Sequence, residues 1–548
     1  MVEKPTFDPL PVGASKFIEG LVKKVRYRKK VRQDVHAELQ AHFEDALSDC
    51  ASSQEREQLA ATLIAEFGDP RFLARLIRRG KKRCRPVWVK GMIRLAQVAA
   101  LCVLYLVLCV SRLFIGAPTI KVDTIAWLNE SVRQGRDESL NARHDLIEAC
   151  SLLSKGPSIL TKGPRLIQDM NDVQRQAVEA YLTENQPALD HFRQAATKPH
   201  YWPYYAPVEP MPELTGIGTV TVPGMMDSMA MIAHLMNQCM ESIRTVRQLA
   251  FAMEYQIQWE TEQGQIDQAL ADCVALIQCG RFMAGTGFLI EEMVGVAIAA
   301  LGHRSTLRVL DVADVNETLL ASTYRKFDAI LRSDKPFMPA DFEKALINDL
   351  VQRCFTDDGR GNGRVLASGM ILAASSTTSL LKDLLLFDFP DRQEITQKIN
   401  TFYERVEAQS GLSPWQLHER PADSEDTHDF WYMDTVGPAL ARVAELGWRL
   451  KTDTEATLAI IGIQHYHATQ GTLPSTLEEL LQAGLVGSIP RDYYSDGPLA
   501  YQRTDEGFLL YSRGEDMKDD GGRPAVTAEG KKHKHGAHGD WVYWPVTP

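Results

Sequence analysis

The most chemically suggestive residues of this chain form an acidic, glycine-rich loop at residues 356–363, with the sequence TDDGRGNG. Interleaved Asp and Asn oxygens are the ligands of EF-hand calcium loops, but this loop lacks both the ligand spacing and the closing glutamate of that motif. It also lacks the Gly-Lys-Ser/Thr ending with which a P-loop holds phosphate. The sequence therefore predicts a glycine-rich turn between two helices.

Histidines and cysteines, the usual ligands of transition metals, form no recognisable metal motif. His533, His535 and His538 lie in a loop rich in lysine and glycine, where we expect solvated side chains. None of the nine cysteines belongs to a Cys-x-x-Cys pair, which argues against a zinc knuckle or a thioredoxin-like site. The chain has no Gly-x-Ser-x-Gly elbow, no His-Glu-x-x-His helix and no dinucleotide fingerprint. We therefore predict no catalytic residues, and enzymatic activity is the less favoured alternative.

A long uncharged stretch determines on which side of a membrane the other segments can lie. Residues 95–111 (LAQVAALCVLYLVLCVS) contain no charged side chain and are bounded by Arg94 and Arg112. At about 1.5 Å per residue, a helix that continues to Gly116 matches the hydrocarbon core of a bilayer. The stretch begins too far into the chain for a cleaved signal peptide, and it lacks the polar stripe of a buried soluble helix. We predict one transmembrane helix within residues 91–116.

Charge divides the chain at this helix. Residues 1–90 contain 19 Lys and Arg against 12 Asp and Glu, a net charge of +7, whereas the remaining residues carry −18. Because cytoplasmic flanks of membrane helices are enriched in Lys and Arg, we predict a single-pass inner-membrane protein with a cytoplasmic N-terminus and an extracytoplasmic C-terminal bulk. The basic flank is expected to touch anionic lipid rather than nucleic acid.

A second apolar stretch at residues 365–387 bears on this topology, because a second crossing would return the C-terminus to the cytoplasm. The stretch contains Lys382, Asp383 and a Ser-Ser-Thr-Thr run, and charged side chains are costly at membrane depth. We interpret it as a buried helix of a soluble domain, and the membrane-embedded alternative stays open.

Residues 1–90 have the pattern of a small helical bundle. Apolar residues recur every four positions between residues 31 and 47, and Gly68-Asp69-Pro70 supplies a helix stop, an N-cap and a first-turn proline. With the stretch YRKKVRQDVHAELQAHFEDALSD and a later helix that ends in Phe67-Gly68-Asp69-Pro70, residues 20–80 resemble the HAAS-type domain, an all-helical module of bacterial membrane proteins. The resemblance implies a membrane-associated signalling or adaptor role without catalysis.

Residues 117–450 predict an α-helical body. A long amphipathic pattern covers residues 225–263, and further helical segments follow it at short intervals after Gly264. Helical hairpins of this length are typical of stacked helical repeats, although no 34-residue period recurs. The histidines of this region are scattered along its helices, so an enzyme site assembled from distant residues is an open alternative. These residues are His191, His200, His234 and His303.

Residues 451–548 predict a small α+β domain, in which helical patterns are followed by three short β-strand patterns. Four short motifs follow one another here: Gly-Thr-Leu-Pro at 471–474, Ile-Pro-Arg-Asp at 489–492, Tyr-Ser-x-Gly-x-Asp at 511–516 and Gly-Asp at 539–540. Through this order, residues 452–548 resemble the globular head of the type II secretion major pseudopilin.

This resemblance implies a calcium site, because in that family the loop after the Tyr-Ser-x-Gly-x-Asp core binds calcium through carboxylate and backbone oxygens. Two differences set the chain apart from a filament subunit: the preceding helix carries charges such as Lys451 and Asp453, and the loop contains the basic insert KKHKHGAH. A solvated acidic loop without calcium is the alternative. The candidate ligands are Ser512, Asp516, Asp519, Asp520 and Asp540.

These patterns predict a mainly α fold with a cytoplasmic helical bundle (1–90), one transmembrane helix (91–116), a body of α-helical hairpins (117–450) and an α+β head (451–548). The predicted function is a membrane-anchored, non-catalytic binding, scaffold or signalling-adaptor protein of the bacterial envelope. We expect the membrane and proteins as partners, no nucleic acid and no small-molecule ligand, with calcium as the one cofactor to consider. The alternatives are an envelope enzyme with an unrecognised site in the helical domain and an accessory protein of a secretion apparatus.

Overall fold

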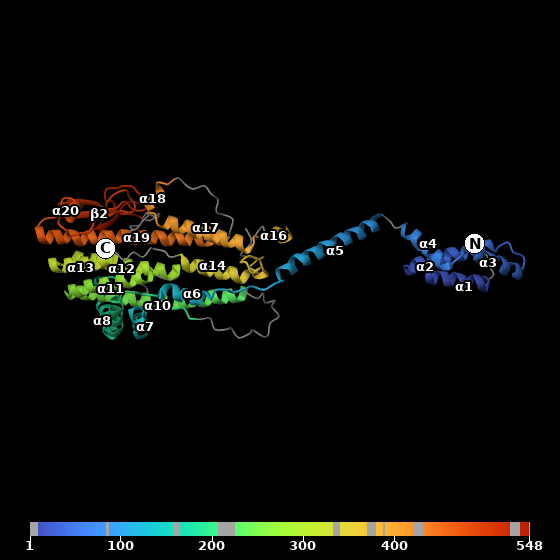
Figure 1. Cartoon of the computed structure of the whole chain (residues 1–548), viewed down its shortest axis with the longest axis horizontal. Helices are drawn as coiled ribbons and strands as arrows, with labels where there is room; N and C mark the ends of the chain where they lie inside the picture. Colours follow the sequence, from blue (N-terminus) through green and yellow to red (C-terminus); the bar gives the residue numbers. More distant parts are fainter. Residues whose placement is uncertain are drawn as a thin grey trace. The chain divides into compact units, whose positions relative to one another are not determined.

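In the computed structural model the chain forms two compact units, Met1–Leu108 and Cys109–Pro548 (Figure 1). Within the residues that the structure describes, the protein is mainly helical and has a small three-stranded sheet near its C-terminus, as the sequence predicts. The described residues are 9–83, 87–154, 156, 165–206, 225–285, 287–331, 340–369, 380–386, 389–420, 431–526 and 538–546.

The N-terminal unit begins with four helices, α1 (Val12–Lys24), α2 (Lys29–Ala46), α3 (Ser53–Phe67) and α4 (Pro70–Arg83). Their apolar faces enclose a small core around Ile18 and Phe43. Local sequence sets the boundary between α3 and α4: Gly68 ends α3 with a positive φ of 68°, and the Asp69 carboxylate accepts a hydrogen bond from the Arg71 N–H at the start of α4 (2.9 Å). The predicted stop and cap signals act as expected.

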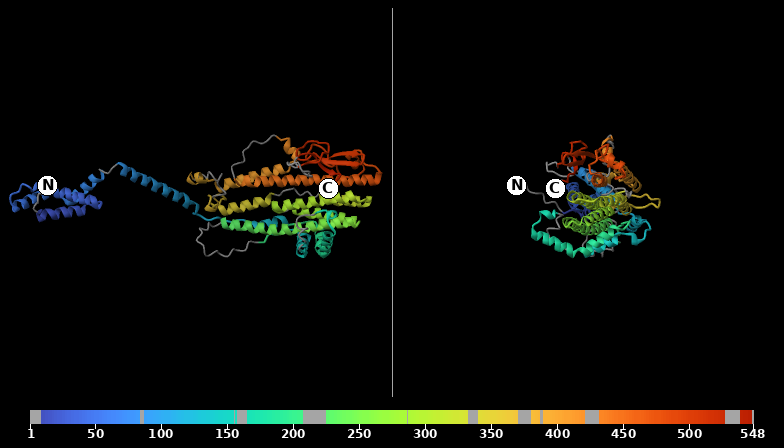
Figure 2. Two further views of the ribbon diagram at one scale, coloured as in Figure 1. Left: turned by 180° about the vertical axis from the view of Figure 1, so that it is seen from behind. Right: turned by 90° about the vertical axis from the view of Figure 1, so that its left-hand side faces the viewer.

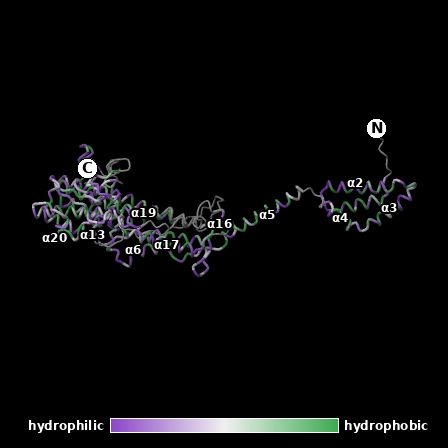
Figure 3. Tube along the Cα trace, turned by 90° about the horizontal axis from the view of Figure 1, so that it is seen from above, coloured by the Kyte–Doolittle hydropathy of each residue, from purple (hydrophilic) through white to green (hydrophobic). Residues whose placement is uncertain are grey.

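Helix α5 (Val87–Leu113) follows, and most of its apolar side chains are exposed. Its segment Gly91–Leu113 is, among the described residues, the one helix long and apolar enough to cross a membrane, and only 6% of its most apolar part is buried. Figure 3 shows this helix coloured as hydrophobic over most of its length. Exposed apolar side chains on successive turns are unfavourable in water.

The C-terminal unit contains a body of helices that lie side by side (Figures 1 and 2), with α7 and α8 on one side of the helical layers and the sheet on the opposite side. The helices up to residue 331 are α6 (Thr124–Arg133), α7 (Arg143–Leu152), α8 (Asp172–Glu184), α9 (Gln186–Ala196), α10 (Met225–Glu262), α11 (Ile266–Met283), α12 (Leu289–Val312) and α13 (Glu317–Leu331). The later ones are α14 (Asp341–Cys354), α16 (Leu380–Leu386), α17 (Arg392–Ser410), α18 (Pro414–His418), α19 (Trp431–Gln470) and α20 (Leu477–Gln482).

Helices α11 and α12 pack at unusually close range because glycines line their contact. A Cβ atom on Gly280 would lie 2.4 Å from the backbone nitrogen of Ala299, and one on Gly295 would lie 2.3 Å from that of Ala284. The backbones therefore approach to a distance that no side chain allows. Ala284 and Ala299 at this contact are buried in a cluster with Val296 and with Leu450 of α19.

The head is built on the C-terminal half of α19. Strands β1 (Ala500–Thr504), β2 (Gly507–Ser512) and β3 (Trp541–Trp544) form an antiparallel sheet in that order. Side chains from the sheet, such as Leu510 and Trp541, enter the same core as Ile460 of α19. The predicted small α+β arrangement is thus present as a helix packed on a three-stranded sheet.

Two predicted features meet the structure only in part. Helix α19 runs without a break past residues 450 and 451, so the predicted boundary between body and head falls inside one helix. Of the second apolar stretch, residues 370–379 and 387 lie outside the described residues. Val365 and Leu366 before this gap are buried, and α16 after it ends in the exposed Leu386.

Candidate functional site

A buried aspartate organises the loops of the head. The Asp492 carboxylate accepts hydrogen bonds from the Ser512 hydroxyl (2.7 Å) and from the backbone N–H groups of Arg513 and Tyr494 (both 3.0 Å). Burial raises the pKa of this carboxyl group, and its hydrogen bonds oppose the rise. The hydroxyl of Ser512 is therefore directed at a carboxylate. Sequence reasoning did not single out Asp492, although it ends the Ile-Pro-Arg-Asp motif.

The acidic candidates use their oxygens to hold the loop backbone. Asp540 is fully buried and accepts hydrogen bonds from the N–H groups of Asp520 (3.1 Å) and Gly522 (2.7 Å). Asp519 accepts one from the Tyr511 hydroxyl (3.0 Å). The structure thus places Asp519 and Asp520 beside Asp540.

The last acidic candidate, Asp516, holds the two ends of the same region together. Its carboxylate accepts hydrogen bonds from the N–H groups of Lys518 and Gly539 (both 3.2 Å). Residue 538, the only one of the three loop histidines within the described residues, forms a backbone bridge with Val526. His533 and His535 lie outside the described residues.

The electrostatics of this loop bear directly on calcium. Burial raises the pKa of Asp540 to about 6, and the negative charges of Asp519 and Asp520 add to the rise. A divalent cation would relieve this repulsion, which is the chemistry that the predicted ligand set implies. In the described part of the chain, however, no three His, Cys, Asp or Glu side chains converge closely enough to hold a metal ion. The calcium site stays a prediction.

The loop at residues 356–363 is a turn held by ion pairs. Asp357 lies between two cations, Lys121 (2.6 Å) and Arg392 (3.1 Å), and accepts a hydrogen bond from the Gly359 N–H (2.8 Å). The hydrogen bond from Lys121, followed by that from Gly359, lowers the pKa of Asp357 to about 2. Asp357 therefore stabilises a glycine-rich turn that follows α14 and contacts the start of α17 through Arg392.

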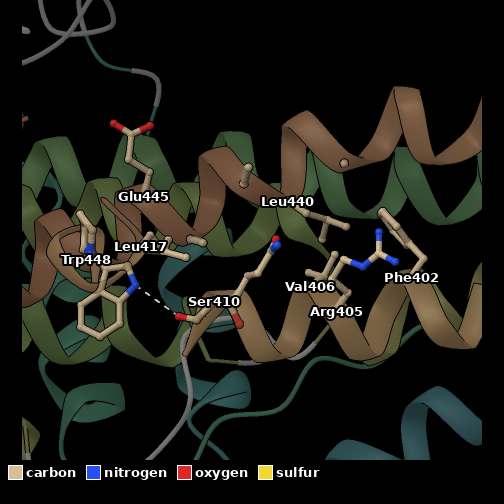
Figure 4. Close-up of a pocket in the computed structure, with 13 residues that line it drawn as sticks. Phe402, Arg405, Val406, Ser410, Leu417, Leu440, Glu445 and Trp448 are labelled. Carbon is tan, nitrogen blue, oxygen red and sulfur yellow. Dashed lines mark hydrogen bonds between the residues drawn. The ribbon is translucent and has the colours of Figure 1, made fainter. Parts of the chain in front are cut away.

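A groove lies between α17, α18 and α19 (Figure 4). Its volume is about 550 Å³, and Phe402, Val406, Leu417 and Leu440 supply much of its lining. At one end the indole N–H of Trp448 donates a hydrogen bond to the Ser410 carbonyl (3.2 Å), which ties α19 to the end of α17.

Charged groups lie at the rim of this groove. Figure 4 shows the Glu445 carboxylate directed away from the apolar side chains, and Arg442 (2.6 Å) and Arg449 both donate hydrogen bonds to it. Arg449 also contacts the head, through Glu515 (3.1 Å) and the face of Trp541 (5.3 Å from the guanidinium carbon to the ring centre). The groove offers shape and apolar surface, and Glu445, the one acid among its described lining residues, is already neutralised by arginines. Such a surface suits binding better than acid–base catalysis.

The histidines of the helical body have separate surroundings. The ring nitrogens of His303 contact the hydroxyls of Thr454 (3.0 Å) and Thr457 (3.1 Å), which places it between α12 and α19. His234, on α10, contacts the backbone carbonyl of Ala206 (3.2 Å). These hydroxyl and carbonyl partners are neutral, as for histidines whose hydrogen bonds stabilise a fold.

Two buried carboxyl groups meet the N-terminus of α12. Glu291 accepts hydrogen bonds from the Tyr205 hydroxyl (2.7 Å) and the Phe288 N–H (3.0 Å), and Glu343 accepts one from the Leu289 N–H (2.7 Å). Burial raises the pKa of both groups, that of Glu343 to about 7. Both carboxyl groups accept hydrogen bonds from N–H groups that have no partner within the helix at its start. Glu291 is recognisable in the sequence as an acid in the first turn of an apolar helix, whereas nothing local signals Glu343.

A second buried cluster joins α9, α10 and α11. The guanidinium of Arg193 donates to Asp272 through two nitrogens (2.6 and 2.8 Å) and lies 3.3 Å from Glu260. Both carboxylates are almost completely buried, so the arginine compensates charges that water cannot reach. Like the acids of α12, this cluster holds helices together.

Comparison with known proteins does not assign the chain to a family. No protein-family model matches the chain, and neither a curated protein nor a solved structure matches it.

Proposed function

We propose that this chain is a single-pass, membrane-anchored, non-catalytic scaffold or signalling-adaptor protein of the bacterial envelope. The observation that carries the proposal is α5, whose apolar segment Gly91–Leu113 exposes its side chains between the helical bundle at its N-terminal end and the large unit at its C-terminal end. In a bilayer these side chains would contact lipid instead of water, and every backbone group of the helix would be hydrogen-bonded internally.

Charge supports an orientation with the N-terminal bundle in the cytoplasm. Eight Lys and Arg side chains lie within residues 78–94 on the N-terminal flank of α5, whereas only Arg112 and Lys121 lie close to its C-terminal end. Basic flanks are retained on the cytoplasmic side of inner membranes. The helical body and the head would then lie outside the cytoplasm, where they could meet envelope proteins.

Binding is favoured over catalysis by the partners of the acidic residues. Asp272 and Glu445 contact arginines, and Asp357 contacts a lysine and an arginine, so these groups stabilise the fold. The groove between α17 and α19 supplies a concave apolar surface for a protein partner. A HAAS-like bundle at residues 20–80 and a pseudopilin-like head at residues 452–548, with calcium in its acidic loop, belong to this proposal.

Topology is the decisive test. A reporter that is active only outside the cytoplasm is fused after Pro548 in one version of the full chain and after Gly80 in another. Activity of the C-terminal fusion alone is the expected result. Activity of the fusion after Gly80 alone would reverse the orientation. Activity of neither would require a second crossing near residues 365–387 or no crossing at all, and either result would overturn the proposal.

A further inference from the structure

Helix α4, which precedes α5, combines strong positive charge with exposed apolar side chains. Its sequence, PRFLARLIRRGKKR, contains no acidic residue. Its basic residues are Arg71, Arg75, Arg78, Arg79, Lys81, Lys82 and Arg83. Lys81 pairs with Glu38 of α2 (3.0 Å), whereas no carboxylate among the described residues forms an ion pair with the four arginines at 71–79.

The two faces of α4 have different partners. Leu73, Ala74 and Ile77 pack into the bundle, in a cluster with Leu21 and Val25. Residues of the opposite face include Phe72 and Leu76, which are 58% and 45% exposed, and the exposed Arg75 and Arg79. Both pairs are four residues apart, so they form adjacent rows on one surface of the helix.

This surface has the composition of helices that lie in a membrane interface. Aromatic and aliphatic side chains enter the boundary between headgroups and acyl chains, while arginines beside them extend their guanidinium groups to phosphate. In water, by contrast, Phe72 and Leu76 remain uncovered, and Arg75 and Arg79 have no carboxylate partner in the described part of the chain. An acidic lipid surface satisfies both needs at once.

Chain length keeps α4 near the bilayer. Helix α4 ends at Arg83 and α5 begins at Val87, so at about 3.6 Å per residue the two helix ends are at most roughly 15 Å apart. The segment apolar enough to span begins only four residues later, at Gly91. Four helical residues add about 6 Å, so the C-terminal end of α4 is held within roughly 20 Å of the start of the span, close to the headgroup layer around it.

We infer that the outward face of α4, with Phe72, Leu76, Arg75 and Arg79, docks on the anionic headgroup surface of the membrane. The inference rests on the proposed function, because α5 must cross that membrane to bring α4 to it. Docking would fix the N-terminal bundle against the cytoplasmic surface instead of leaving it free on a short tether. A basic helix can also bind nucleic acid, but phosphate contacts alone give no role to two exposed apolar side chains.

The test uses the full-length protein with the photoreactive residue p-benzoyl-phenylalanine at one position at a time. Position 72 reports on the proposed surface. Position 59 is the matched control, because Leu59 is an exposed apolar residue of the same bundle but lies on α3, beside Glu55 and Glu57. Position 104 reports on the span, because Leu104 is an exposed residue in the middle of α5. The protein is placed in nanodiscs of phosphatidylcholine with or without phosphatidylglycerol, irradiated, and analysed by mass spectrometry.

The expected result is a phospholipid adduct at positions 72 and 104 and none at position 59, with the adduct at 72 dependent on phosphatidylglycerol. The double change Arg75→Gln and Arg79→Gln should weaken docking about fivefold per lost charge and leave the adduct at 104 unchanged. An adduct at position 104 without one at position 72 would overturn the proposed docking surface on α4 and leave the transmembrane assignment of α5 unaffected. Absence of both adducts would overturn the span as well. In irradiated cells, an adduct at 72 that a nuclease removes would assign the surface to nucleic acid instead.

Discussion

Replacing Glu343 by glutamine should stabilise the C-terminal unit at neutral pH and leave it nearly unchanged at acidic pH. The Glu343 carboxyl group is buried between α14 and the start of α12, and burial raises its pKa from 4.5 to about 7. The folded protein therefore holds this proton up to about pH 7, whereas the unfolded chain releases it near pH 4.5. Stability from this group is fully present below pH 4.5 and is lost as pH rises to about 7.

The size of the effect follows from the difference between the two pKa values. Each pKa unit corresponds to about 1.4 kcal/mol, so the wild-type protein loses about 3 kcal/mol of unfolding free energy between these pH values through this one group. Glutamine carries no charge at any pH, and its side-chain oxygen can still accept the hydrogen bond from the Leu289 N–H. For a unit of this size, about 3 kcal/mol corresponds to a rise of about 3 °C in melting temperature.

Melting of the full-length protein in detergent, followed by tryptophan fluorescence from pH 4.5 to pH 8, measures this difference. The matched control is Glu179→Gln, because Glu179 is exposed in the middle of α8. The melting curves of wild type and Glu343→Gln should coincide at pH 4.5 and separate progressively above it. A separation that is equal at all pH values, or one that the control reproduces, would refute the argument from burial.

Three further predictions concern the packing, the charges and the metal site. Gly295→Ala should destabilise the protein by about 3 kcal/mol in denaturant unfolding, because its Cβ would meet the backbone at the end of α11. The control Gly437→Ala should be tolerated, because the nearest atom to its Cβ would be 3.8 Å away. Equal costs of the two changes would contradict the close packing. Arg193→Met should lower the free energy of unfolding by about 3–5 kcal/mol in the same assay, because it leaves two buried carboxylates unpaired. Lys398→Met, in a largely exposed ion pair, should change it little. A small effect of Arg193→Met would show that the buried cluster is dispensable. Calcium at about 1 mM should raise the melting temperature of the C-terminal unit, and Asp519→Asn should reduce that rise. Identical melting with and without calcium would exclude the predicted site.

Features written in consecutive residues were predictable from the sequence. The end of α3 and the start of α4 depend on Gly68, Asp69 and Pro70, whose conformational preferences act within one turn. The apolar length of α5 is likewise a local property. The strands near the C-terminus were recognisable because alternate residues, such as Phe508 and Leu510, face the core.

Features that depend on distant partners were not predictable. Asp272 is buried because Arg193, 79 residues earlier, reaches it, and Glu343 is buried because α12 begins beside it. The continuity of α19 is a similar case, since Pro438 weakens the helix locally while packing against α12, α13 and α17 supports it. For the acidic loop of the head, the sequence indicates which oxygens are present, but not that Asp540 is directed at backbone N–H groups.

The unbroken course of α19 has a practical consequence for dividing the protein into fragments. A head cut out at residue 451 would begin in the middle of a helix and would uncover Ala456, Ala459 and Ile460, which are fully buried in the intact unit. Such a fragment would expose apolar surface that belongs to the body and would be prone to aggregate. Arg449, which lies just before the cut, would be separated from Glu515 and Trp541. Recombinant work on the head should therefore retain the helical body, and the two are best regarded as one folding unit.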